Sequence, residues 1–232
     1  SSFLANLDGG TSPLAGAESD ADDDVTSIFH QRRLDYDQIL ELIPPGASVL
    51  DLGCGSGGLL ARLRRRGHGR LVGVELDEQE IVRCVARGLD VIHMDLNGGL
   101  SCFGEKAFDC VVLSQTLQTI RDVARVLDDM LRVGRRCIVS FPNFAVWNSR
   151  LSVLLSGRMP KTRDLPFEWY ETPNLHPFTL DDFQAYCREN RIEILEIREQ
   201  ADSFVGRLLL KAGLRNLGAD RAIVRIARKD GK

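Results

Sequence analysis

The chain has 232 residues, a mass of 25.8 kDa and a formal net charge of −3, from 30 Lys and Arg against 33 Asp and Glu. This length suits one α/β domain with additional segments, and a domain of this size can bury a core without disulfides or metals. The slightly acidic balance argues against nucleic-acid binding through overall charge. The sequence holds neither an apolar run of the ~18 residues that a membrane span needs nor the layout of a signal peptide.

The six cysteines are scattered along the chain, without a C-x-x-C pair and without clustering beside histidine. Scattered cysteines in a chain without a signal peptide are typical of reduced, mostly buried thiols. We therefore predict a cytoplasmic protein with no metal site and no membrane segment.

Residues 1–30 differ in composition from the rest, because they combine Gly, Ser and Pro with an acidic run at residues 18–24. Such a segment cannot bury enough apolar surface to offset its ordering entropy. We expect an acidic, flexible tail or linker over 1–30 and a folded domain over 31–232. The chain begins at Ser1 without Met, as a fragment or a trimmed chain would, and a linker here would allow fusion to an upstream catalytic domain.

The next part of the chain alternates short apolar runs with amphipathic stretches. A short helix is expected at 34–43, where Pro44 and Pro45 end it. Strands are then expected at 48–52, 70–76, 91–94, 108–114 and 137–141, with helices at 57–66, 77–87 and 121–133. This alternation predicts a doubly wound α/β fold whose mostly parallel sheet is covered on both faces.

The C-terminal part predicts a helix and two further strands. Thr179 can cap a helix that runs to about Asn190. Alternating strands follow at 192–198 and 222–227, which makes seven strands, and we expect the last to be antiparallel. Two inserts remain, at 142–178 and at 204–217. The first could form a lid over a pocket.

A glycine-rich turn is the strongest functional signal. Residues 49–57 read VLDLGCGSG, a buried strand that runs into G-x-G-x-G and a helix. Glycine is needed where backbone approaches a ligand closely or adopts positive φ. Asp51 precedes Gly53 by two positions, and Glu75 ends the next strand, 22 positions after Gly53. A carboxylate there can accept both ribose hydroxyls of an adenosine ligand.

Residues 49–57 and 72–77 resemble the first two motifs of class I S-adenosylmethionine (SAM)-dependent methyltransferases, and 94–96 (MDL) resembles the third. The resemblance implies a site for SAM or S-adenosylhomocysteine, in which Asp95 contacts the adenine amino group. The alternatives are a cap or turn role for Asp95, and a tight turn without ligand for the glycines. The expected cofactor-binding residues are Asp51, Gly53, Cys54, Gly55, Gly57, Glu75, Leu76, Asp95, Leu96 and Ser114.

Longer strings downstream resemble the methionine biosynthesis protein MetW family over about residues 33–228. They are VLSQTLQ (112–118), MLRVGRR (130–136), VSFPNF (139–144), GRMP (157–160) and WYETPNLH (169–176). The resemblance implies a role in methionine synthesis beside a homoserine O-acyltransferase, whose activity MetW proteins are thought to support. The chain departs from the usual family form in its N-terminal extension.

Whether the site transfers a methyl group depends on a base near the end of the fourth strand. The residues there are Ser114, Gln115, Thr116 and Gln118, and none of them is a base. His176 is the best candidate, with a loop histidine bonded to backbone as the alternative. The favoured hypothesis is therefore a SAM-binding accessory or regulatory subunit. The alternative is an active methyltransferase on a small molecule or protein, with the 142–178 insert shaping the acceptor pocket.

Several other residues have both a functional and a structural interpretation. Asn143 could orient a substrate or end a strand, and Trp169 and Tyr170 could stack on a ligand, anchor a partner or pack in a lid. The basic residues at 62–70 are expected to complement a helix C-terminus rather than bind nucleic acid. The apolar and basic stretch at 204–217 could touch a membrane or a partner, and an ordinary packed helix is the simpler expectation. Structural roles are expected for His30, His68 and His93.

Overall fold

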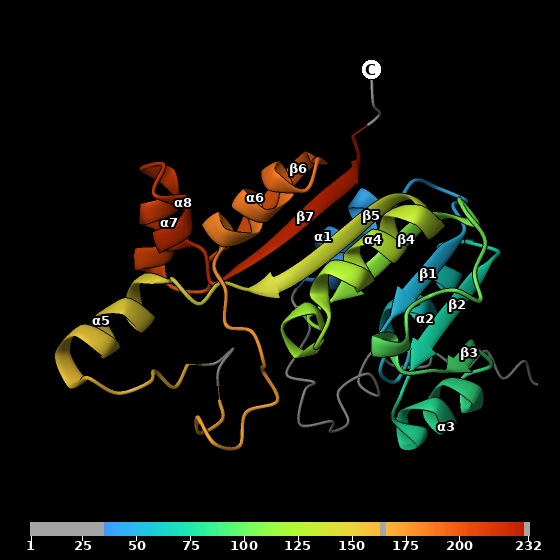
Figure 1. Ribbon diagram of the computed structural model, residues 1–232, viewed down its shortest axis with the longest axis horizontal. Helices are drawn as coiled ribbons and strands as arrows, with labels where there is room; N and C mark the ends of the chain where they lie inside the picture. The colour runs from blue at the N-terminus through green and yellow to red at the C-terminus, as the bar shows by residue number, and fades with distance from the viewer. Residues whose placement is uncertain (1–34, 163–165, 230–232) are drawn as a thin grey trace, which may run out of the picture. The chain divides into compact units, whose positions relative to one another are not determined.

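Seven strands form one sheet in the order β3-β2-β1-β4-β5-β7-β6, as Figure 1 shows. The strands β1 to β5 pair in parallel, and β7 runs antiparallel to both β5 and β6. This confirms the predicted seven-stranded, mostly parallel sheet with an antiparallel last strand. The bounds are β1 Val49–Leu52, β2 Leu71–Glu75, β3 Asp90–His93, β4 Phe108–Ser114, β5 Gly134–Pro142, β6 Ile192–Gln200 and β7 Arg221–Arg228.

The computed structural model describes residues 35–162 and 166–229, which belong to one compact unit, Leu34–Lys232. The tail predicted for residues 1–30, including His30, lies outside the described residues. Within the described ranges, the helices are all too short or too polar to cross a membrane.

The central strands are buried on both faces, which explains their continuous apolar sequence. All four residues of β1 are buried, and so are six of the seven in β4. β5 begins at Gly134, three residues before the predicted start. The backbone of Gly134 and Arg136 already pairs with β4, although the side chains of Arg135 and Arg136 are exposed. Charged side chains at a strand end therefore hid the true start from the sequence pattern.

Helices cover both faces of the sheet and create two cores. On one face, α1 (Tyr36–Leu42), α2 (Gly58–Arg65) and α3 (Glu78–Ala86) contribute to a core that includes Val49, Val112 and Ile138. On the other face, α4 (Val123–Val133) and α6 (Leu180–Glu189) contribute to a core that includes Leu50, Val111 and Val139. Thr179 and Asp182 form a capping box at the start of α6, which confirms the predicted cap.

Three further helices extend beside the end of the sheet. The 142–178 insert contains α5 (Trp147–Ser156), which the sequence did not predict, and the 204–217 stretch forms α7 (Phe204–Lys211) and starts α8 (Arg215–Gly218). We expected an ordinary packed helix at 204–217. The segment is helical, but α7 buries only Gly206 and leaves its apolar side chains partly or fully exposed, so the expected packing is wrong. Gly206 packs against Gly218, where a Cβ on either would lie 2.7 Å from the other's carbonyl oxygen.

Phe183 of α6 anchors this helix to the sheet and provides a test of the fold. Its ring lies 4.9 Å from that of Phe141 in β5 and 6.3 Å from that of Phe178, measured between centroids. Phe183→Ala should lower the free energy of unfolding by about 3–5 kcal/mol, because it leaves a cavity in a buried aromatic cluster. Phe204→Ala, at a side chain that is 74% exposed, should change it by less than ~0.5 kcal/mol. Urea unfolding followed by circular dichroism checks both; equal losses would contradict the assignment.

Candidate functional site

The sheet order reverses between β1 and β4, because the chain builds outward to β3 on one side and to β5 on the other. In open α/β sheets, ligands bind beyond the carboxyl ends of the strands at this switch point. The turns after β1, β2, β3 and β4 all lie at that edge, since the four strands are parallel. The predicted site residues fall mostly in these turns.

The turn after β1 is a tight glycine loop. Gly53, Gly55 and Gly57 have φ values of +69°, +54° and +79°, in the left-handed region that favours glycine. A Cβ on Gly53 would lie 2.8 Å from Thr116 Oγ1, and one on Gly57 would lie 2.3 Å from Leu89 Cδ1. The loop therefore needs glycine both for its backbone conformation and for space.

The loop is fixed to the end of β2 by backbone hydrogen bonds. The amides of Gly53 and Cys54 donate to the Val74 carbonyl at 2.8 and 3.1 Å. The amide of Gly55 donates to Glu75 Oε2 at 2.7 Å. Glu75 Oε1 accepts from the amides of Leu76 and Asp77 at 2.7 and 3.0 Å. The Glu75 carboxylate is thus held in one place by three amides and joins the first two motifs.

The other predicted acidic and apolar residues occupy distinct environments. Asp51 is buried in β1, whereas Leu76 is exposed beside Glu75. Asp95 begins the short helix η2 (Leu96–Gly98), and its Oδ1 accepts from the backbone and side-chain amides of Asn97 at 2.9 and 2.8 Å. Asp95 therefore has the cap role, and its contact with adenine stays a prediction. Leu96 is buried in the core, so only its backbone could face a ligand.

The side chain of Cys54 points under the loop rather than toward the open edge. Its Sγ lies 4.0 Å from that of Cys84 in α3, and both thiols are buried. The hydrogen bond to Cys84, burial and the negative charge of Asp51 all raise the pKa of the Cys54 thiol. Cys54 is therefore a neutral packing residue, and its contribution to a cofactor site would come from its backbone.

Ser114 takes part in a buried network that the sequence did not reveal. Asp35, directly before α1, is buried, and its Oδ2 accepts from Ser114 Oγ at 2.8 Å and from Ser140 Oγ at 2.7 Å. The network ties the start of α1 to β4 and β5. The Ser114 hydroxyl thus donates its hydrogen bond within the protein. Asp35 is a carboxylate at the ends of β4 and β5, although it lies far from both strands in the sequence.

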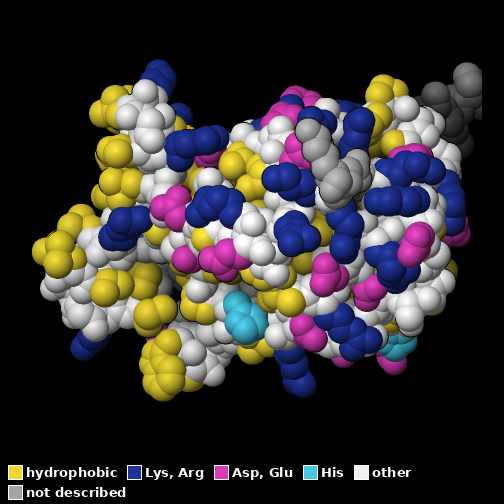
Figure 2. Space-filling model, turned by 45° about the horizontal axis from the view of Figure 1, so that its top comes forward, with side chains coloured by type: hydrophobic (Ala, Val, Ile, Leu, Met, Phe, Trp, Pro, Cys, Tyr) yellow, Lys and Arg dark blue, Asp and Glu magenta, His cyan; other side chains and the backbone are white. Residues whose placement is uncertain are grey.

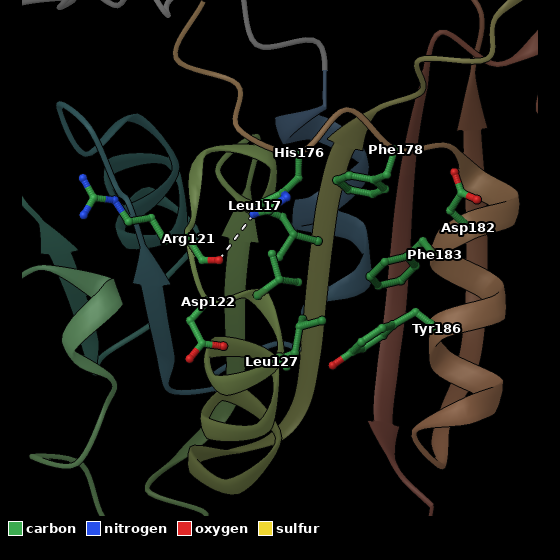
Figure 3. Close-up of a pocket in the computed structure, with 11 residues that line it drawn as sticks. Leu117, Arg121, Asp122, Leu127, His176, Phe178, Asp182, Phe183 and Tyr186 are labelled. Atoms are coloured by element: carbon green, nitrogen blue, oxygen red, sulfur yellow. Dashed lines mark hydrogen bonds between the residues drawn. The ribbon is translucent and has the colours of Figure 1, made fainter.

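His176 lies on the face between α4 and α6, where Figure 3 shows a groove. One ring nitrogen, Nε2, is 3.3 Å from the carbonyl oxygen of Arg121, as expected for a loop histidine bonded to backbone. The Arg121 guanidinium points away from the groove. His176 therefore lines a rim, and a role as general base stays a prediction.

The groove has a volume of about 760 Å³, within the usual range for small-molecule sites. Its walls are mostly apolar and include Leu117, Leu127 and Phe183, whose side chains point into the space between the helices (Figure 3). Burial and the nearby Asp128 raise the pKa of Tyr186, which keeps its phenol neutral. The groove could hold an apolar ligand, but it opens on a helical face, not on the glycine loop itself.

Asn143 has a structural role. Its Nδ2 donates to the carbonyls of Asn216 and Ala219 at 2.8 and 2.9 Å, and its Oδ1 accepts from the amides of Ala145 and Leu180 at 3.3 and 3.2 Å. The buried carboxamide thus joins the end of β5 to α6 and α8. The interpretation in which Asn143 orients a substrate is not supported by these contacts.

The basic residues at 62–70 also make structural contacts. Arg64 Nη1 donates to the Gly88 carbonyl, Arg70 Nη1 donates to the Ala107 carbonyl, and the His68 ring bonds to the Ala47 carbonyl. Nothing in these contacts indicates nucleic-acid binding. By contrast, Trp169 and Tyr170 are exposed and stack edge to face, 5.6 Å apart, instead of packing inside a lid.

The residues at the sheet edge fit an adenosine-containing ligand such as SAM. The glycine loop brings backbone close to the edge without side chains, the Glu75 carboxylate stands at the end of β2, and Leu76 offers an exposed apolar surface beside it. Within the described ranges, no group of three or more His, Cys, Asp or Glu could hold a metal ion.

Comparison with solved structures shows the fold. A SAM-dependent methyltransferase from Mesorhizobium loti is similar with a TM-score of 0.62 and 18% identity, over 84% of this chain and 97% of that one. The [4+2]-cyclase SpnF is similar with a TM-score of 0.59 and 18% identity, over 84% of this chain and 81% of that one. The chain therefore has the class I methyltransferase fold, which also occurs in a cyclase.

Comparison of sequences shows the family. The chain is 38% identical over 206 residues to the bifunctional methionine biosynthesis protein MetXA/MetW of Rhodopirellula baltica, a match that covers 85% of this chain and 33% of that protein. The chain spans about a third of the length of the first curated relatives it matches. A family model described as methionine biosynthesis protein MetW matches residues 33–225. With this match over most of its length, the chain belongs to the MetW family.

Proposed function

We propose that the chain binds SAM or S-adenosylhomocysteine at the glycine loop. The observation that carries this proposal is the position of the Glu75 carboxylate, held at the end of β2 by the amides of Gly55, Leu76 and Asp77. A fixed carboxylate accepts ribose hydroxyls without losing side-chain entropy on binding. The methionine part of the ligand would then follow the loop at 53–57, with adenine near Leu76 and Asp95.

Replacing the carboxylate tests this site. Glu75→Ala should weaken the binding of S-adenosylhomocysteine by about 1.5–3 kcal/mol, because the ribose hydroxyls lose a charged acceptor. Glu78→Ala, an exposed carboxylate in the first turn of α3, should leave the affinity unchanged. Isothermal titration calorimetry measures both, with circular dichroism as a check on folding. Gly55→Arg should abolish binding while the sheet stays intact, and retained affinity in Gly55→Arg or Glu75→Ala would exclude this site.

We further propose that the chain acts as an accessory or regulatory subunit of a homoserine O-acyltransferase. The support comes from the R. baltica relative, whose name joins MetXA to MetW in one bifunctional protein; MetX denotes a homoserine acetyltransferase. Fusion in one organism favours association of the separate chains in another. The site itself is consistent with binding rather than turnover, since Gln115, Thr116 and Gln118 follow β4 and Asp35 is engaged by two serines.

An activity titration tests the subunit hypothesis. The homoserine O-acyltransferase of the same organism is assayed with increasing amounts of this chain, with and without SAM. We expect the rate to rise and to saturate at a fixed stoichiometry, because the active species is a complex. A further change with SAM would make the chain a sensor of methyl-donor supply, since a ligand shifts an equilibrium only through its different affinity for the two states.

Glu75→Ala serves as the matched control in this assay. The variant should still raise the rate but should lose any response to SAM. A rate that stays constant at every ratio of the two proteins would contradict the subunit hypothesis. It would favour the alternative, an active methyltransferase, for which the acceptor would be sought with radiolabelled SAM.

A further inference from the structure

The most unusual surface of the described residues is formed by α5 and α7. Leu154 and Leu155 of α5 are 79% and 76% exposed, and Phe204 of α7 is 74% exposed. Figure 2 shows hydrophobic side chains gathered over these helices on the left of the view. We call this surface the apolar end; its large exposed side chains are Leu151, Val153, Leu154, Leu155, Met159, Phe204, Val205, Leu208 and Leu214.

The apolar end is one connected structure rather than two loose helices. Trp147 at the start of α5 donates its indole N–H to Ser203 Oγ, directly before α7, at 3.3 Å. Ser203 Oγ in turn accepts from the amide of Gly206 at 2.9 Å. Asn143 holds α8 to the end of β5, and Gly206 packs on Gly218. A connected surface costs less entropy on binding than a flexible one.

Its size fits a specific protein interface. Single exposed hydrophobic residues are normal on a surface, but many of them gathered at one end of the molecule mark an interaction site. Nine large apolar side chains that are 42–79% exposed present an area on the order of the ~800 Å² that one partner contributes to a standard interface. Burial of the exposed aliphatic residues would then supply most of the binding free energy.

The charged residues within the two segments of the apolar end all have one sign, although Lys161 and Arg215 pair with Glu168 and Glu199 outside them. Residues 144–162 and 203–217 contain six Lys and Arg and no Asp or Glu, although the whole chain has more acidic than basic residues. The cations are Arg150, Arg158, Lys161, Arg207, Lys211 and Arg215. Positive charges at the rim of an apolar patch complement a partner whose own patch has an acidic rim, and they exclude partners with a basic one.

A protein explains this surface better than a lipid bilayer. Helices that lie on anionic membranes carry many Lys and Arg along one face. α5 holds a single cation, Arg150, in ten residues, and α7 holds two in eight. The small number of cations on α5 and α7 therefore favours the apolar surface of a partner protein over a bilayer.

We propose that the apolar end is the surface through which the chain docks on the homoserine O-acyltransferase, at an apolar patch with an acidic rim. This inference rests on the proposed function, since it names where that partner binds. In Figure 1 the apolar end lies at the opposite side of the sheet from α3 and β3. Docking there leaves the glycine loop open, so that SAM can bind and leave while the complex persists.

The experiment places charge on the surface and on a matched control. Leu154→Asp with Leu155→Asp, and separately Phe204→Asp with Leu208→Asp, should each weaken binding of the acyltransferase by at least about tenfold, because a buried carboxylate would face an apolar and acidic partner. The control is Val82→Asp with Val85→Asp on α3, at side chains that are 66% and 61% exposed; its affinity should equal that of the wild type. Calorimetry with the same organism's acyltransferase measures the affinities.

The possible outcomes separate this inference from the proposed function. If the wild type binds and both apolar-end variants bind equally well, the docking surface is wrong and the subunit hypothesis stands. If the wild type fails to bind, the subunit hypothesis itself fails.

Two further measurements test for other occupants of the apolar end. One is binding of the wild type to phosphatidylglycerol vesicles, which both variants would lose. The other is a wild-type dimer in sedimentation velocity, which both variants would convert to monomer. Either result would overturn the proposal. Unchanged S-adenosylhomocysteine affinity shows that the variants are folded.

Discussion

The candidate site depends on the backbone contact between the glycine loop and the end of β2. Three consecutive amides, those of Gly53, Cys54 and Gly55, donate to the Val74 carbonyl and the Glu75 carboxylate. Gly53 and Gly55 adopt positive φ in this contact, and Thr116, after β4, leaves no room for a side chain at Gly53. Because α2 begins at Gly58, the same contact also fixes where that helix starts. The candidate cofactor site and the β1–α2 connection are therefore one structure.

The features predictable from sequence are those that depend on local chemistry. The glycine spacing, the acid at the end of β2 and the buried strands are each set by neighbours within a few residues, and the structure confirms the elements. The Asp35 network was not predictable, because Asp35 lies 79 residues from Ser114 and 105 from Ser140. Only the order of the strands brings these three side chains together.

Helix α5 escaped prediction for a different reason. Its apolar residues at 151 and 153–155 do not follow a single helical face, and the helix buries one residue fully, Ser149. A helix without a buried apolar stripe gives no periodic signal. The sequence pattern therefore indicated the core and marked the 204–217 stretch as a candidate contact with a partner or membrane, but it did not reveal α5, whose Trp147 bonds to Ser203 directly before α7.

The fold by itself does not decide between binding and catalysis. Structures with this fold include a methyltransferase and a [4+2]-cyclase, each about as similar to this chain as the other. The distinction depends on what stands beyond β4, where this chain has amide and hydroxyl side chains and a carboxylate already bonded to two serines. A subunit that responds to a ligand needs an affinity for that ligand that differs between its free and partner-bound states. It does not need a catalytic base.

The three amide bonds to Glu75 have a consequence for the rate and cost of ligand exchange. A carboxylate offers about four acceptor positions, and three of them are taken. Two ribose hydroxyls would need two positions, so a bound nucleoside would have to displace one amide. Leu76 and Asp77 lie between β2 and α3 and both bond Oε1, whereas Gly55 bonds Oε2, so release of the Gly55 amide would open both positions on that oxygen. Cofactor binding would then shift the backbone of the glycine loop, and this shift would move the first turn of α2, which begins directly after the loop.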